Sequence, residues 1–163
     1  MASVYNWKRY WCPREGSFNL SDDGYLVEPD DDYGRIIAQD VRPFGDIAST
    51  PCLVLLGEPG IGKTTALEEI AASESANFAT LQVDLGEYSS DERLYRHVFE
   101  SSAIREWLTG THTLSVLLDS LDECRVEGIA KVLSGELSRL PSKRLRLRLA
   151  CRTAEWPITL EEA

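Results

Sequence analysis

A short glycine-rich segment between an apolar run and a helical pattern constrains this chain more than any other feature. Residues 57–65 read Gly-Glu-Pro-Gly-Ile-Gly-Lys-Thr-Thr, directly after the apolar run 52–56 and directly before the helix-forming run 66–72. The fixed positions of the spacing G-x-x-x-x-G-K-[ST] are filled by Gly57, Gly62, Lys63 and Thr64. A strand, a glycine-rich loop and a helix in this order predict a loop that wraps around phosphate.

Each residue type in this segment has a chemical reason to be there. Glycines let the backbone curl so that successive N–H groups point at an anion, and the following helix directs its positive dipole end to the same place. Lys63 would add a positive charge at the β- and γ-phosphates, and Thr64 a hydroxyl ligand for Mg²⁺. The alternative is a chance glycine turn before a helix, which the flanking strand and helix disfavour. The predicted nucleotide-binding residues are Gly57, Glu58, Pro59, Gly60, Ile61, Gly62, Lys63, Thr64 and Thr65.

Composition limits the classes of protein that this chain can belong to. Its 163 residues are enough for one α/β domain with a hydrophobic core, and contents of 43% hydrophobic and 27% charged residues are typical of a globular chain. A formal net charge of −10 argues against a nucleic-acid-coating role, since phosphate contacts along a strand need clustered Lys and Arg. Nucleotide binding is compatible with this charge because it relies on backbone N–H groups and one or two cations.

The cysteines and the amino terminus predict a cytoplasmic protein. The four cysteines are scattered and form no C-x-x-C pair, so buried free thiols and a reducing compartment are the simplest interpretation. The first residues lack the apolar core of a signal peptide, and no apolar run is long enough to span a bilayer. We therefore expect no membrane association.

Residues 1–48 differ from the rest of the chain and predict an irregular leader. Trp7, Tyr10 and Trp11 suggest that this leader packs onto the domain, while frequent Pro, Gly and Asp exclude a long helix or strand. The acidic run 30–32 is interpreted as a solvated turn. A second interpretation, that part of the leader borders the nucleotide, stays open without a named residue.

Residues 49–163 predict an α/β domain in which strands alternate with helices. Apolar runs predict strands at 52–56, 79–85, 113–118 and 145–151, and helices at 63–75, at 126–140, and in one segment that begins after Ser90 and includes Leu108. This alternation predicts three layers around a parallel sheet, with right-handed crossovers and the ligand at the carboxyl ends of the strands. The fourth strand alternates Leu with Arg. Taken alone, this pattern is typical of a half-exposed strand, and the preferred interpretation is that the strand enters the sheet from its solvated bottom edge.

An acidic cluster at the end of the third strand supplies the second chemical signal. The apolar run 113–118 leads directly into Asp119, and Asp122 and Glu123 follow within four residues. Asp119 is placed to hold Mg²⁺ directly or through water, and either Asp122 or Glu123 could deprotonate an attacking water. The alternative is an ordinary acidic helix start, which the upstream loop disfavours.

Arg152 supplies the third signal because it lies at the carboxyl end of the fourth strand. From this place its guanidinium could reach a γ-phosphate and report whether that phosphate is present. The alternative is a surface arginine that pairs with Glu155.

Taken together, these motifs resemble a NACHT-type member of the STAND class of P-loop ATPases. The resemblance covers about residues 50 to 155 and rests on the loop 57–65, on the segment 117–124 and on Cys151-Arg152. The second motif of this family runs from an apolar residue to Asp, a small residue, an apolar residue and then Asp-Glu. The matching residues are Asp119, Ser120, Leu121, Asp122 and Glu123.

The resemblance implies an ATP/ADP-driven switch that uses Mg²⁺ and forms homo-oligomers through this domain, in signalling or defence. It implies the sheet order 5-1-4-3-2, of which this chain would supply 1-4-3-2. A fifth strand, a helical lid, a winged helix and sensor repeats follow in family members, whereas this sequence stops at residues 161–163. We therefore expect a fragment or a truncated product, and whether it hydrolyses ATP alone stays open.

Other functions remain open at this stage. A module that binds ADP or ATP without hydrolysis fits the same residues. A P-loop kinase has no obvious use for the Asp122-Glu123 pair, and a DNA-dependent motor would carry more positive charge, so both rank lower.

Overall fold

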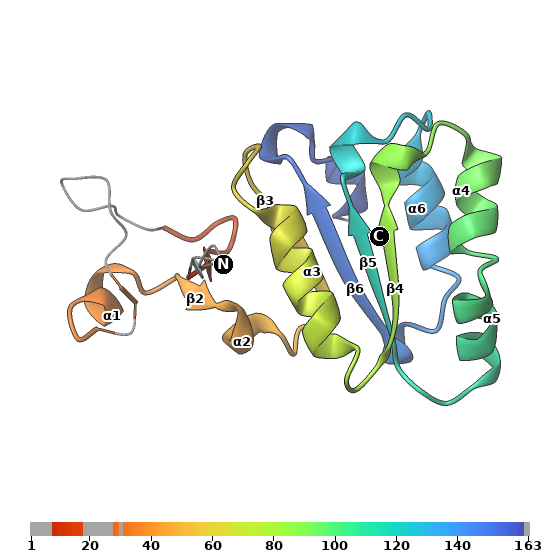
Figure 1. Cartoon of the computed structure of the whole chain (residues 1–163). Helices are drawn as coiled ribbons and strands as arrows, with labels where there is room; N and C mark the ends of the chain where they lie inside the picture. The colour runs from red at the N-terminus through yellow and green to blue at the C-terminus, as the bar shows by residue number, and fades with distance from the viewer. Residues whose placement is uncertain (1–7, 18–27, 30, 162–163) are drawn as a thin grey trace, which may run out of the picture. The chain divides into compact units, whose positions relative to one another are not determined.

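The structure, a computed structural model, describes residues 8–17, 28–29 and 31–161, and these divide into two compact units between Thr50 and Pro51 (Figure 1). In the first unit, strand β1 (Tyr10–Trp11) pairs antiparallel with β2 (Arg42–Pro43). Two single-turn helices, α1 (Gly34–Ile37) and α2 (Phe44–Ile47), complete its regular structure among the described residues. Trp7 and Asp30 of the expected leader lie outside the described residues.

The second unit contains a four-stranded parallel sheet. Its strands are β3 (Cys52–Leu56), β4 (Ala79–Asp84), β5 (Leu114–Asp119) and β6 (Leu145–Cys151). They lie in the order β3-β6-β5-β4, and every neighbouring pair is parallel. The predicted order 1-4-3-2 is confirmed, and with it the α/β class.

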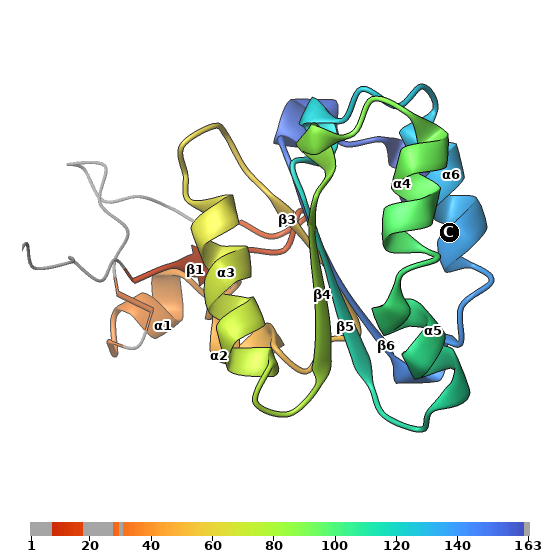
Figure 2. The same ribbon diagram turned by 45° about the vertical axis from the view of Figure 1, so that its right-hand side comes forward.

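Helices cover both faces of this sheet, as Figure 2 shows. Helix α3 (Lys63–Glu74) lies on one face, and the other face carries α4 (Asp91–Val98), α5 (Ser102–Thr109) and α6 (Ile129–Leu137). The three layers match the prediction. Short 3₁₀ turns connect these elements: η1 (Leu85–Glu87), η2 (Leu121–Glu123), η3 (Ser142–Arg144), η4 (Thr153–Glu155) and η5 (Ile158–Leu160).

The single helix that was expected after Ser90 is divided into two helices, α4 and α5. The segment after Ser90 breaks between α4 and α5, where Ser101 adopts an extended conformation and its side chain accepts the N–H of Ile104 at 3.3 Å. A serine in this position starts a new helix because its oxygen satisfies an N–H that would otherwise have no partner. Leu94 and Trp107, one from each helix, are both buried in the core beneath.

The core is centred on β5, all six residues of which are buried. The uninterrupted apolar run there was expected from a strand covered on both faces, and this expectation is confirmed. Leu147, Leu149 and Cys151 of β6 belong to the same apolar cluster, which includes buried residues of α4, α5 and α6.

The interpretation of the fourth strand as half-exposed is wrong beyond its first two residues, because Leu145 and Arg146 are partly buried and residues 147–151 are buried. Arg148 is fully buried, and its Nη2 lies 2.9 Å from the Glu74 carboxylate at the end of α3. Nε of Arg146 lies 3.4 Å from the same carboxylate, to which the Ser115 hydroxyl also donates. The leucines of β6 therefore face α4–α6, and its arginines face α3 on the other side of the sheet.

Burial lowers the pKa of the Arg148 guanidinium, and the charge and hydrogen bond of Glu74 oppose this shift. Two further bonds from Nη1 go to the carbonyl oxygens of Pro51 and Leu147. A strand pattern alone cannot reveal such a network, because the partner carboxylate lies 74 residues away in sequence.

Among residues 8–17, 28–29 and 31–161, no helix combines the length and the apolar character that crossing a bilayer requires.

Replacing Glu74 with Gln should destabilise the fold by about 3–5 kcal/mol, because Arg148 would remain buried without its counter-charge. Urea unfolding followed by circular dichroism measures this loss. The control is Glu68→Gln on the exposed side of the same helix, where we expect a change within about 0.5 kcal/mol. Equal effects of the two substitutions would contradict the importance of the buried pair.

Candidate functional site

The loop that follows β3 has the conformation that its glycines allow. Gly60 and Gly62 have φ angles of 80° and 90°, in the region that residues with a side chain rarely adopt. Gly62 is the cap of α3, and its carbonyl oxygen accepts the N–H of Ala66 at 2.9 Å. The amino-terminal end of α3 consequently lies at the inner side of the loop, where its unpaired N–H groups favour an anion.

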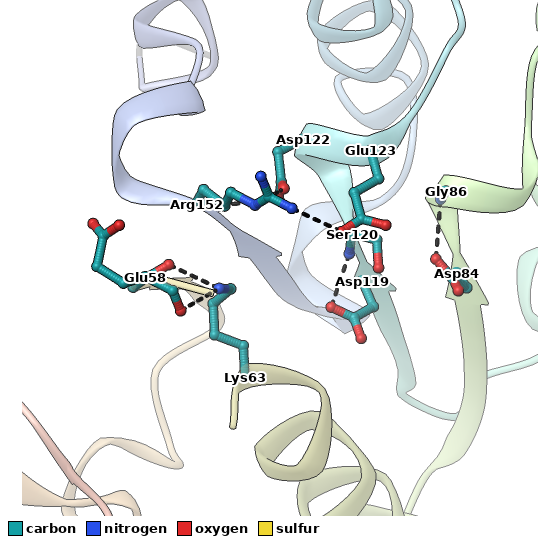
Figure 3. Close-up of polar contacts among 10 residues, drawn as sticks. Glu58, Lys63, Asp84, Gly86, Asp119, Ser120, Asp122, Glu123 and Arg152 are labelled. Atoms are coloured by element: carbon teal, nitrogen blue, oxygen red, sulfur yellow. Dashed lines mark hydrogen bonds and ion pairs between the residues drawn. The ribbon is translucent and has the colours of Figure 1, made fainter. Parts of the chain in front are cut away.

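Lys63 lies at the start of this helix and folds back onto the loop (Figure 3). Its Nζ donates to the carbonyl oxygens of Gly57 and Glu58, at 2.7 and 3.2 Å. The ammonium group is thus held by two neutral acceptors, which an incoming anion could replace.

A pocket of about 360 Å³ lies beside this loop. The residues that line it are Pro59, Gly60, Gly62, Lys63, Thr64, Thr65, Asp119, Ser120, Asp122, Glu123 and Arg152. It therefore joins six of the predicted loop residues with all four predicted residues from the ends of β5 and β6. Gly57, Glu58 and Ile61 were also predicted, and they do not line it.

Parallel pairing brings the acidic residues to this pocket. Asp119 is the last residue of β5 and only 6% exposed, and its Oδ1 accepts the N–H of Ser120 at 2.8 Å. Ser120 then turns the chain with a φ of 55°, and η2 begins directly after it. This turn directs the next two carboxylates toward the end of β6, where Arg152 lies.

Asp122 and Glu123 have different environments, although the sequence pattern does not distinguish between them. Oδ2 of Asp122 lies 2.8 Å from Nε of Arg152, and its Oδ1 accepts the backbone N–H of Arg152 at 3.0 Å. The Asp122 side chain is 5% exposed, whereas that of Glu123 is 58% exposed. Glu123 Oε1 accepts one hydrogen bond from Nη2 of Arg152 at 3.1 Å.

Arg152 therefore pairs with the two carboxylates after β5 and has about half of its side chain exposed (Figure 3). The sequence had left open a pairing with Glu155, whose backbone N–H bonds to the Arg152 carbonyl oxygen instead.

The Cys151 thiol, next to Arg152 in the chain, lies in a part of the site that is closed to solvent. Cys151 is fully buried at the end of β6. Burial, followed by the negative charge of Asp122, raises the pKa of the Cys151 thiol to about 11. The thiol is therefore a packed neutral group and not a nucleophile at neutral pH.

The oxygen groups in the pocket suit Mg²⁺. Among the described residues, no three His, Cys, Asp or Glu side chains gather into a cage that could hold a metal by themselves. Thr64 and Asp119 both line the pocket, and one or two protein oxygens with phosphate and water complete the usual Mg²⁺ shell. The donor set fits this ion.

Sequence reasoning did not select two residues that lie here. Ser120 lines the pocket, and its place inside the D-x-x-D-E spacing was the available signal. Asp84 ends β4 directly opposite Asp119 in the parallel register and accepts the N–H of Gly86 at 3.0 Å. Its position after a strand, like that of Asp119, could have indicated it.

The chain is similar in part to a much longer protein. Over 103 residues, 63% of this chain, the sequence is 32% identical to an uncharacterized WD repeat-containing protein of Synechocystis sp.. The match spans 6% of the length of that relative. No model of a protein family matches the chain.

We expect the turn at Ser120 to tolerate glycine and to reject a β-branched residue. Ser120→Val should lower the free energy of unfolding by about 1–3 kcal/mol, because valine is strained at positive φ. Ser120→Gly is the matched control and should stay within about 1 kcal/mol of the parent protein. Denaturant unfolding of both variants measures the difference, and a valine variant as stable as the glycine variant would contradict the assigned backbone.

The Cys151 thiol should make the fold sensitive to alkaline pH. An unfolded thiol ionises near pH 9, whereas the folded one keeps its proton to about pH 11, so the stabilisation is present below pH 9 and lost on going to pH 11. Over this interval the parent protein should lose about 2–3 kcal/mol more stability than Cys151→Ala. Urea unfolding at several pH values measures both slopes, and parallel curves would show that this thiol is not responsible.

Proposed function

We propose that the second unit is the nucleotide-binding core of a P-loop ATPase, with ATP or ADP and Mg²⁺ as its ligands. One observation carries this proposal: a single pocket is lined by the Lys63-Thr64 loop, by Asp119 from the end of β5, and by Arg152 from the end of β6. These groups come from three elements that are distant in sequence, and together they supply what a nucleoside triphosphate and its metal need.

The pocket residues divide the work between binding and chemistry. The loop N–H groups and Lys63 would bind the phosphates, while Thr64 and Asp119 would hold the ion. Mg²⁺ held by these residues would neutralise charge on the phosphates. Glu123 is the better of the two candidate bases because its side chain is exposed and only its Oε1 contacts Arg152 among the described residues, whereas both oxygens of Asp122 bind Arg152.

A second function, nucleotide binding without turnover, is favoured by one observation. Glu123 contacts Arg152 in this structure, so it would have to leave that contact before it could orient water. A site in which this exchange does not occur would bind ADP or ATP and act only as a switch.

The wider role follows from the resemblance to NACHT-type STAND ATPases. We infer a cytoplasmic nucleotide switch in signalling or defence that assembles with further copies through this domain. The Synechocystis relative is much longer than this chain and contains WD repeats, an organisation compatible with a switch attached to sensor repeats.

Nucleotide binding and turnover test the proposal directly. Lys63→Ala should weaken Mg·ATP binding at least tenfold, since it removes a charged hydrogen-bond donor worth about 1.5–3 kcal/mol. Glu123→Gln should bind ATP within about threefold of the parent but lower turnover by about 10²–10⁴. Calorimetry and phosphate release measure the two quantities.

The matched control is Lys143→Ala, an exposed lysine at the opposite end of β6, which should change neither quantity. If the parent protein binds neither ATP nor ADP in the presence of Mg²⁺, the proposed function is wrong. If it binds ATP without releasing phosphate, the second function, nucleotide binding without hydrolysis, is correct.

A further inference from the structure

Asp122 is bound to Arg152 through both of its oxygens. One oxygen accepts the Arg152 backbone N–H at 3.0 Å, and the other lies 2.8 Å from the side-chain Nε. The Asp122 side chain is only 5% exposed, and each of its oxygens already contacts Arg152. Its geometry is that of a clamp, and it leaves little room for proton transfer from an attacking water.

The clamp controls where the guanidinium of Arg152 can lie. Because the backbone and Nε of Arg152 are bound by the same carboxylate, the arginine side chain is fixed at its base and at its head. The remaining part of the guanidinium is directed toward Glu123 and borders the pocket with it (Figure 3).

The two ion pairs of Arg152 differ in how easily they can be exchanged. A buried pair held by good geometry is costly to break, because separating it leaves an uncompensated charge. An exposed pair such as that with Glu123 contributes little. An anion entering the pocket would therefore replace Glu123 at the guanidinium and leave Asp122 in place.

We propose that Asp122 is a positioning residue that holds Arg152 toward the terminal phosphate of a nucleoside triphosphate. Arrival of that phosphate exchanges the Arg152–Glu123 contact for an Arg152–phosphate contact and frees Glu123 to orient water. This inference rests on the proposed function, and it adds a role for Asp122 and a link between recognising a third phosphate and releasing the base.

The test compares affinities for a non-hydrolysable ATP analogue and for ADP, each with Mg²⁺, by calorimetry on the whole chain. In Asp122→Asn the preference for the analogue should fall about tenfold, while ADP affinity stays within about twofold. Arg152→Lys, which lacks Nε, should show the same loss. The double variant should lose no more than either single variant, because the two residues act as one unit.

Glu123→Gln is the contrasting variant. It should keep or increase the preference for the triphosphate analogue, because it weakens the competing partner of Arg152, and it should lose turnover. If Asp122→Asn instead keeps its preference and loses turnover as Glu123→Gln does, Asp122 is the base and the proposal is wrong. Should Asp122→Asn fail to fold, as judged by circular dichroism, Arg152→Lys decides: an unchanged preference overturns the proposal.

A measurement without nucleotide separates this inference from the proposed function. The Nε–H proton of Arg152 should exchange slowly with water in nuclear magnetic resonance spectra of the parent protein and of Glu123→Gln, and at least tenfold faster in Asp122→Asn. Rapid exchange in a parent protein that binds ATP would overturn the clamp alone. Slow exchange in a parent protein that binds no nucleotide would support the clamp and overturn the proposed function.

Discussion

The parallel pairing of β6 with both β3 and β5 decides where the polar groups of the site can lie. β3 leads into the glycine-rich loop, β5 ends in Asp119, and β6 ends next to Arg152. Because parallel strands present their carboxyl ends at one edge, placing β6 between the other two brings all three chemical signals to one pocket. A different strand order would separate the loop from the carboxylates, even if every local motif were unchanged.

The register of β6 is fixed by charge as well as by hydrophobic packing. A shift by one residue would exchange the faces of the whole strand and place its leucines against α3. The same shift would move Arg148 away from Glu74 and into the apolar cluster beneath α4–α6. A buried charge without a partner is far more costly than a misplaced leucine. The Arg148–Glu74 pair thus helps to specify the register of β6.

Much of the architecture could be read from local patterns, and the site could be read only in part. Strand order followed from the resemblance carried by the motifs, and the buried nature of β5 followed from its apolar run. The Leu/Arg alternation of β6 led to a wrong prediction of exposure. Arg148 is buried because it pairs with Glu74, and no residue near it in the sequence indicates this partner. Likewise the sequence treated Asp122 and Glu123 alike, since the difference between them arises only when the end of β6 packs against η2.

The unequal exposure of these two carboxylates explains how one arginine can serve both structure and response. A guanidinium has donors on separate nitrogens, so one contact can be permanent while another is exchanged. With Nε committed to buried Asp122, an anion in the pocket competes only with exposed Glu123. The exposed Arg152–Glu123 pair contributes about 0–1 kcal/mol. A charged hydrogen bond between Arg152 and the anion contributes about 1.5–3 kcal/mol, so the anion can replace Glu123. If both carboxylates were buried, an anion could not replace either of them at Arg152. If both were exposed, neither would hold the guanidinium toward the pocket.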